Sequence, residues 1–311
     1  MTMSETATPT RPTLVCMTWR GGERLTRSLT SIEQSHEQFD RIIISVTAPE
    51  DSDDMRQAQQ LKERLPQIEV ICTGRELPTM QHQAFWVDYL EATGTAPDDW
   101  IYWLAYDDEV RLHGIEAMTD EQGNWPLEPH TAYFGPWAMR HEHPDQLWNG
   151  DPTEDLESWT SFPAEGPLRL TVAQWIGDQL RQPTYMQMSG SVNHFRSFTA
   201  LRDSWPRKRG PMRIEMAIAA APHVTHVEEF SEPVSIIYGR SNSDRASYGK
   251  EARREDLHLL AWLARHSAAH PHQAWTTSAS VLSATAIKAR ALISPAALPQ
   301  EEWRVRGTVL P

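Results

Sequence analysis

The 311-residue chain lacks any run of about 18 or more apolar residues, the length that a membrane-spanning helix requires, so no transmembrane helix is expected. It has only two cysteines, Cys16 and Cys72, which excludes a zinc site of the CxxC type. Both lie in apolar runs, which predicts buried free thiols in a reducing compartment. Basic residues are outnumbered: 29 Lys and Arg against 42 Asp and Glu give a net charge of -13. This balance argues against a nucleic-acid partner, because phosphate binding needs a basic face.

Glycine-rich phosphate signatures are missing as well: the chain has no Walker-type loop, no Gly-x-Ser-x-Gly and no dinucleotide fingerprint. Residues 20–30 resemble the signature of sugar-phosphate nucleotidyltransferases but lack its third glycine and its threonine. Such glycines let the backbone approach a phosphate closely. We interpret this stretch as a chance similarity around a helix start.

The first 12 residues are rich in Thr, Ser and Pro and contain no apolar core of the signal-peptide kind. They are therefore expected to form a disordered tail rather than a secretory signal, which implies a cytoplasmic location. The 13 tryptophans are numerous for this length. They are compatible either with burial in the core or with stacking on sugar faces.

Apolar and β-branched runs alternate with helical periodicity over residues 13–105. Runs without polar alternation are typical of strands covered on both faces, as in a parallel sheet. Strands are expected at residues 13–17, 41–46, 68–73 and 100–105, and helices at residues 23–34, 55–65 and 79–92. This order predicts an α/β fold with a mostly parallel sheet flanked by helices.

The pattern weakens after Gly123, because residues 124–168 hold seven prolines and four tryptophans but little periodicity. Further elements are expected with less regular spacing. Strands are predicted at residues 137–140, 186–192 and 233–238, and helices at residues 171–180, 193–203, 212–221, 250–267 and 279–292.

Acidic side chains follow the strand at residues 100–105. Asp107 and Asp108 come directly after this buried run, and ligands of open α/β sheets bind beyond the carboxyl ends of strands. Their hard oxygens suit Mg²⁺ or Mn²⁺ bridging a diphosphate. Alternatively, the two aspartates merely cap a helix that begins near Val110. Position and clustering leave both interpretations open.

This order of elements, with Leu104-Ala105-Tyr106-Asp107-Asp108 after the fourth strand, resembles the inverting family 2 glycosyltransferases of GT-A fold. The acidic motif of that family often reads Leu-x-x-Asp-Asp, and Ala105 stands here in place of the first aspartate of a full DxD. The resemblance covers roughly residues 13–120, with weaker similarity up to about residue 250. It implies a GT-A (Rossmann-like) mixed sheet.

The resemblance also implies an activity and a division of the chain. A metal-dependent enzyme of this kind moves a sugar from a nucleotide diphosphate sugar to a hydroxyl of a glycan or lipid-linked glycan, with inversion, in polysaccharide or glycoconjugate synthesis. Residues 13–249 would form the catalytic domain, with donor binding in 13–120 and acceptor binding in 121–249. Residues 250–311 would form a C-terminal helical extension.

Site residues are carried over from the family position by position. Asp107 and Asp108 would hold the metal ion. Nucleotide-sugar contacts are implied for Thr18, Trp19, Arg20, Thr47, Thr79, Gln81, His82 and Asp107. Trp19 could stack on a base and Arg20 could reach a phosphate. A surface histidine is the alternative for His82.

The family also implies a carboxylate base near the start of a later helix. Glu215 occupies that place, and Arg213 could orient it or bind phosphate. The alternative is a helix whose Arg213 and Glu215 face solvent.

Two other functions stay open: a metal-dependent nucleotidyltransferase, and a non-catalytic nucleotide-sugar-binding protein. Ala105 and the lack of a second acidic residue next to Glu215 in the sequence motivate the latter. The apolar stripe over residues 278–294 is typical of packing on its own domain, of a homodimer contact, or of a peripheral helix at the inner face of a membrane.

Overall fold

The computed structural model describes residues 10–141, 156–163, 165–181, 188–204, 214–239, 261 and 304–305. A mixed eight-stranded sheet forms its centre, in the order β3-β2-β1-β4-β10-β6-β11-β9. Its strands are β1 (Thr13–Thr18), β2 (Arg41–Val46), β3 (Glu69–Cys72), β4 (Trp100–Ala105), β6 (Thr131–Tyr133), β9 (Arg169–Thr171), β10 (Ser191–His194) and β11 (His226–Glu228). β10 and β9 run opposite to the others, so the predicted α/β fold with a mostly parallel sheet is confirmed.

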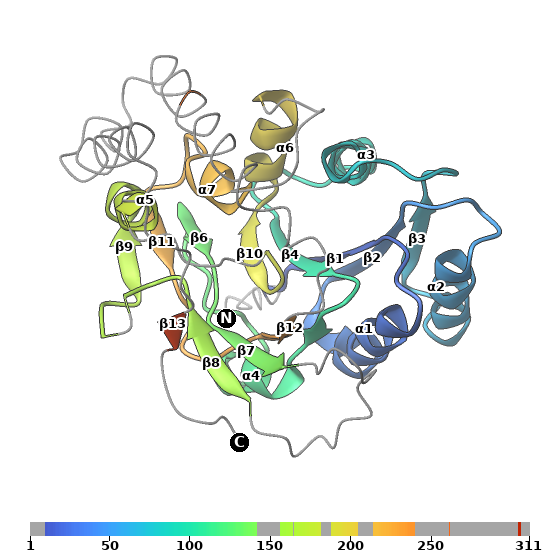
Figure 1. Ribbon diagram of the computed structural model, residues 1–311, viewed down its shortest axis with the longest axis horizontal. Helices are drawn as coiled ribbons and strands as arrows, with labels where there is room; N and C mark the ends of the chain where they lie inside the picture. Colours follow the sequence, from blue (N-terminus) through green and yellow to red (C-terminus); the bar gives the residue numbers. More distant parts are fainter. Residues whose placement is uncertain are drawn as a thin grey trace, which may run out of the picture.

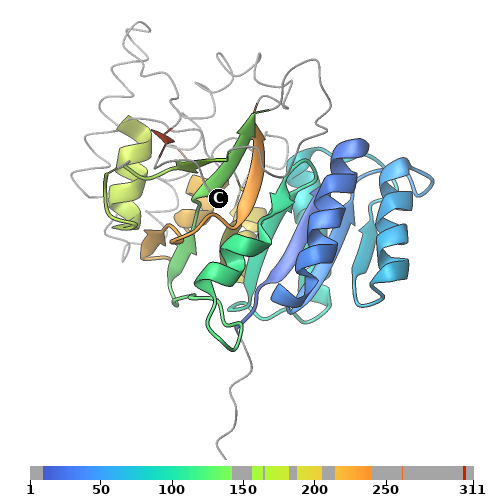
Figure 2. The ribbon, with the colours of Figure 1, turned by 90° about the horizontal axis from the view of Figure 1, so that it is seen from below.

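Helices cover both faces of this sheet (Figure 1). One face packs against α1 (Glu23–Ser35), α2 (Asp53–Arg64) and α4 (Leu112–Met118), which Figure 2 shows in front of the strands. The other face packs against α3 (Thr79–Ala92), α5 (Val172–Arg181), α6 (Phe195–Ser204) and α7 (Ile214–Ala219). Successive residues of β1 alternate between these cores: Leu14 and Cys16 enter one, Val15 and Met17 the other. This two-sided burial explains the unbroken apolar runs in the sequence.

A second, five-stranded sheet lies beyond the end of β4, in the order β13-β8-β7-β12-β5. Its strands are β5 (Glu109–Val110), β7 (Trp137–His141), β8 (Glu157–Thr160), β12 (Ser235–Gly239) and β13 (Arg304–Val305). The three-residue turn from Tyr106 to Asp108 joins β4 to β5 and so connects the two sheets. The two aspartates therefore lie at a junction where both sheets can supply partners.

The early elements agree with the predicted ones to within about two residues, whereas the later ones differ more. The helix expected to begin near Val110 is present as α4 but starts at Leu112, because Glu109–Val110 pairs with β12. The helix expected from residue 193 begins at Phe195, since Asn193 and His194 belong to β10. Six short strands, β5, β6, β8, β9, β11 and β13, were not predicted.

Of the predicted helical extension over residues 250–311, the structure describes only a helical residue 261 and β13, a short strand paired with β8. The two helices expected there otherwise lie outside the described residues, as does the stripe over residues 278–294. No helix within the described ranges is long and apolar enough to cross a membrane.

Candidate active site

A pocket of about 470 Å³ opens at the carboxyl ends of β1, β2 and β4, beside the start of α3. Apolar side chains, among them Met17, Trp103 and Pro78, form much of its wall. Five of the residues predicted to contact a nucleotide sugar also line it: Thr18, Trp19, Thr47, Thr79 and His82. The converging strand ends thus bring together residues that are far apart in the sequence.

Thr18 and Thr47 end neighbouring strands but differ in how their hydroxyls are used. The Thr47 hydroxyl accepts a hydrogen bond from the Leu77 backbone N–H at 2.7 Å, which ties the loop before α3 to β2. The Thr18 side chain is fully buried, yet its Oγ1 has no hydrogen-bond partner in the structure. A buried hydroxyl without a partner costs about 1–3 kcal/mol. Thr18 lines the pocket, so its hydroxyl lies just behind the pocket wall, where a ligand that displaces the covering atoms would pair with it.

His82 is a buried residue of the pocket floor, so the surface-histidine alternative is wrong. Its Nε2 lies 2.8 Å from the Ser45 hydroxyl of β2. Burial lowers the pKa of His82 to about 4, because the charged ring would lose its hydration. The ring is therefore neutral at physiological pH and can exchange hydrogen bonds without carrying charge.

The loop after β1 has an unusual backbone. Arg20 has a φ of 50°, a left-handed backbone conformation that residues other than glycine rarely adopt. Its guanidinium pairs with Glu76, a lining residue of the pocket, with Nε and Oε1 2.9 Å apart, whereas Arg20 itself is outside the lining. Trp19 is 41% exposed beside it, with the Arg20 guanidinium 5.4 Å from the ring centroid. A flat aromatic face is thus presented at the rim, where a base could stack.

Residues at the start of α3 line the same pocket. Pro78 occupies the N-cap position, and no side chain caps this end of the helix. Thr79 lines the pocket, whereas Gln81 is half-buried and lies outside the lining. The structure therefore brings together the predicted contacts at Thr79 and His82, but not the one at Gln81.

Asp107 and Asp108 are both buried at the junction of the two sheets, directly after the pocket residues Ala105 and Tyr106. Asp108 accepts a hydrogen bond from the Ser189 hydroxyl at 2.5 Å and another from the Tyr238 backbone N–H at 3.3 Å. Burial, together with the negative charge of Asp107, raises the pKa of Asp108 well above its usual range.

The helix-cap interpretation of these aspartates is wrong. α4 starts four residues after Asp108, and its N-cap residue, Arg111, makes no side-chain cap bond. The Asp108 carboxylate instead faces partners from the loop before β10 and from β12. Helix capping therefore does not explain why two adjacent carboxylates are buried at this position.

The donor chemistry of the pair fits a hard divalent cation. Each Asp108 oxygen accepts one hydrogen bond and keeps a further lone pair, and a cation would offset the mutual repulsion of the two carboxylates. Mg²⁺ commonly takes one or two carboxylates and completes its shell with waters and substrate phosphates. Within the described ranges, no group of three or more His, Cys, Asp or Glu could hold a metal ion.

The predicted base, Glu215, lies in the first turn of α7 and is buried, so the interpretation of a solvent-facing Glu215 is wrong. It is not among the residues that line the pocket. Arg213 lies outside the described residues.

Sequence reasoning missed Ser189 and Tyr238, the two partners of Asp108. They lie 81 and 130 residues away along the chain. The run over residues 186–192 indicated only a strand. Tyr238 contributes only its backbone N–H, so the residue type at this position gives no sign of the contact.

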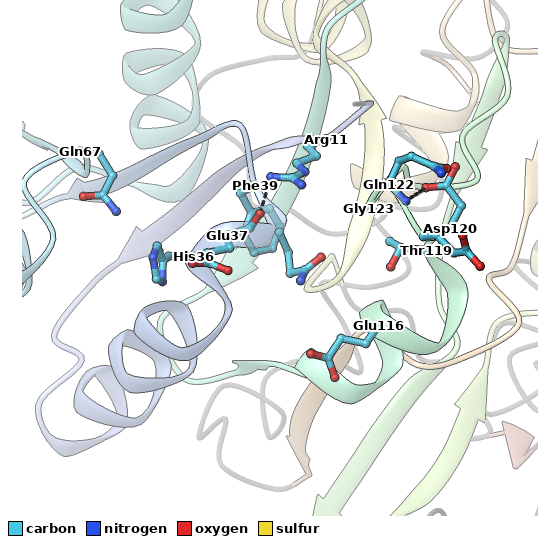
Figure 3. A pocket seen from close by; sticks show the side chains of 12 residues that line it. Arg11, His36, Glu37, Phe39, Gln67, Glu116, Thr119, Asp120, Gln122 and Gly123 are labelled. Atoms are coloured by element: carbon cyan, nitrogen blue, oxygen red, sulfur yellow. Dashed lines mark hydrogen bonds between the residues drawn. The ribbon is translucent and has the colours of Figure 1, made fainter. Parts of the chain in front are cut away.

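A wider depression of about 720 Å³ lies at the opposite edge of the sheet, where Arg11, Phe39 and Gln67 precede β1, β2 and β3 (Figure 3). Its polar groups bond mainly to one another and to the backbone: Arg11 donates to the Glu37 carbonyl at 2.8 Å, and Asp120 accepts from Gln122 N–H at 2.9 Å. None of the predicted site residues lines it.

No protein-family model matches the chain, and no curated protein matches it. Similar solved structures include TarS 1-349 of S. aureus, at 11% identity and a TM-score of 0.49, covering 86% of this chain and 75% of that one. The mannosyltransferase PcManGT of Pyrobaculum calidifontis, in complex with GDP-Man and Mn²⁺, has 11% identity and a TM-score of 0.44, with 92% and 76% covered. The 4-diphosphocytidyl-2C-methyl-D-erythritol synthase has 14% identity and a TM-score of 0.37, with 78% and 98% covered. Likenesses this distant carry no argument about activity, and the fold class rests on the strand order itself.

Proposed function

We propose that this protein is a metal-dependent glycosyltransferase of GT-A-like fold that uses a nucleotide diphosphate sugar. One observation carries the proposal: the pocket with the unpartnered Thr18 hydroxyl is lined by Ala105 and Tyr106, and the buried Asp107–Asp108 pair follows them directly in the chain without lining the pocket itself. A nucleoside would occupy the pocket and its diphosphate would point toward the carboxylates. Open α/β sheets bind nucleotides at this edge, which supports the assignment.

Each part of the donor would meet a different group of side chains. Thr18 would hydrogen-bond the base or ribose, and Trp19 would stack on the base. Arg20, whose ion pair with Glu76 is exposed and so weakly held, would turn to the diphosphate. Asp107 and Asp108 would hold Mg²⁺ or Mn²⁺, which when bound neutralises charge on the diphosphate leaving group.

Transfer to a hydroxyl acceptor also requires a base. Glu215 would take the proton of the acceptor hydroxyl while that oxygen attacks the anomeric carbon from the side opposite the leaving diphosphate, giving inversion. The acceptor would be a glycan or lipid-linked glycan, and synthesis of a polysaccharide or glycoconjugate is the setting. Cytoplasmic location, peripheral membrane contact and a homodimer remain predictions from the sequence.

The experiment offers purified protein UDP- and GDP-sugars with Mn²⁺ and measures released nucleoside diphosphate, with and without glycan acceptors. We expect release from one donor class, loss of release in Asp108→Asn, and loss of turnover with retained donor binding in Glu215→Gln. Pyrophosphate released from a nucleoside triphosphate and a sugar 1-phosphate would instead identify a nucleotidyltransferase. Donor binding without any release would identify a binding protein.

A further inference from the structure

The turn before β10 is held against the end of β4 by several buried contacts. The Gly190 backbone N–H donates to the Trp103 carbonyl at 2.9 Å. The Ser189 carbonyl accepts from the Trp137 indole N–H at 2.7 Å and from the Ser235 hydroxyl at 3.1 Å. Gly190 has a φ of 79°, and a Cβ there would lie 2.4 Å from the Ser235 hydroxyl, so only glycine fits this turn. The position of Ser189 is therefore fixed by its surroundings.

The Ser189 hydroxyl links the strand end to the carboxylate. Its Oγ accepts the Ala105 backbone N–H at 3.0 Å and lies 2.5 Å from Asp108 Oδ2. Because the oxygen already accepts from the backbone, its own proton is directed to the carboxylate. The side chain is fully buried, so water does not compete for either bond.

The other carboxylate oxygen is held from the second sheet, where the Tyr238 backbone N–H donates to Asp108 Oδ1 at 3.3 Å. One donor on each oxygen fixes the rotation of the carboxylate plane. Each oxygen keeps a lone pair in a direction set by these two donors. A metal ligand requires this kind of outer support to keep its geometry.

We propose that Ser189 is the positioning residue that sets the Asp108 carboxylate for a divalent cation. The inference rests on the proposed function, because it takes Asp108 as a metal ligand. Ser189 does not touch the cation or the substrate, and it acts through the orientation of Asp108. Outer partners of this kind commonly change metal affinity by about 10- to 100-fold when removed.

The test compares Ser189→Ala with the matched control Ser235→Ala, which removes a buried hydroxyl on β12 that donates to the Ser189 carbonyl but has no hydrogen bond to Asp108. Mn²⁺ affinity is measured by electron paramagnetic resonance in the presence of UDP or GDP. Binding of UMP or GMP without metal is measured in parallel, since it reports the integrity of the pocket. We expect Ser189→Ala to weaken Mn²⁺ binding about tenfold or more, with nucleoside monophosphate binding unchanged and Ser235→Ala close to wild type.

Mn²⁺ binding by wild type and by Asp108→Asn distinguishes a failure of the proposed Ser189 role from a failure of the proposed metal site. If wild type binds Mn²⁺, Asp108→Asn does not, and Ser189→Ala binds like wild type, the role of Ser189 is overturned while the metal site stands. If wild type binds no Mn²⁺, the proposed function and the role of Ser189 both fail. Should Ser189→Ala not fold, Ser189→Cys keeps the side-chain shape with a weaker hydrogen-bond donor, and an Mn²⁺ affinity equal to wild type would contradict the inference.

Discussion

Replacing Thr18 by valine separates the free energy of unfolding from the affinity for a ligand. Valine has the same branched shape but no hydroxyl, and Thr18 is a fully buried residue at the end of β1. The Thr18 Oγ1 has no hydrogen-bond partner in the structure. The substitution therefore removes an unsatisfied polar atom from the free protein while it removes a donor and acceptor from the pocket.

The expected magnitudes have opposite signs. Leaving a buried hydroxyl unpaired costs about 1–3 kcal/mol, so Thr18→Val should increase the free energy of unfolding by about 1 kcal/mol or more. The hydroxyl is already removed from water in the free protein. A ligand that pairs with it therefore gains a hydrogen bond without a further desolvation cost for this group. Loss of about 1–2 kcal/mol of binding free energy corresponds to a Kd about 5- to 30-fold higher.

Urea unfolding and calorimetric titration with UDP and GDP plus Mn²⁺ measure the two effects. Thr131→Val is the matched control, because the buried Thr131 hydroxyl on β6 also lacks a partner but does not line the pocket. It should stabilise the protein similarly and leave the Kd unchanged. A Thr18→Val protein that is less stable than wild type, or that binds the nucleotide as tightly, would refute the reasoning.

Two further predictions concern pH and the backbone. The pKa of His82 is about 4 in the folded protein and near its ordinary value of about 6.5 in the unfolded chain. Because only the unfolded chain takes up the proton between these values, the contribution of neutral His82 to stability is complete above about pH 6.5. It is lost as pH falls toward 4, by at most about 1.4 kcal/mol per pH unit. Urea midpoints at pH 7 and pH 5 should therefore differ less in His82→Gln than in wild type; parallel profiles would be contrary to this assignment. Gly114→Ala should destabilise the protein by about 1–3 kcal/mol, because a Cβ there would lie 1.8 Å from the Pro233 carbonyl oxygen. An alanine in an unobstructed helix would stabilise by up to about 1 kcal/mol, so calorimetry showing a higher Tm would contradict the packing around α4.

The first half of the fold could be predicted because local pattern and tertiary role coincide there. β2 is a contiguous run, Arg-Ile-Ile-Ile-Ser-Val, whose apolar residues serve both cores, and α1 has its buried leucines and isoleucine on one face. β6, β9 and β11 are three residues long, and their pairing is set by contacts between distant segments. Such short strands leave too little periodicity to read from sequence.

The candidate site also has a part that could be predicted from the sequence and a part that could not. Thr18, Thr47 and His82 are carried over from the family resemblance, and the pocket brings them together because Thr18 and Thr47 lie at the carboxyl ends of neighbouring parallel strands, beside the start of α3. The surroundings of Asp108 could not be predicted, since its partners Ser189 and Tyr238 come from segments that are distant along the chain. Charge and hydrogen bonding at the aspartates thus depend on tertiary packing.

The central claim is that the pocket and the Asp107–Asp108 pair form one metal-dependent site for a nucleoside diphosphate. Calorimetric titration of wild type and Asp108→Asn with UDP and GDP, each with and without Mn²⁺, tests it most directly. We expect binding of one diphosphate that is strongly enhanced by Mn²⁺ in wild type and not in Asp108→Asn. Equal binding by both proteins, or no binding of either diphosphate at any Mn²⁺ concentration, would contradict it.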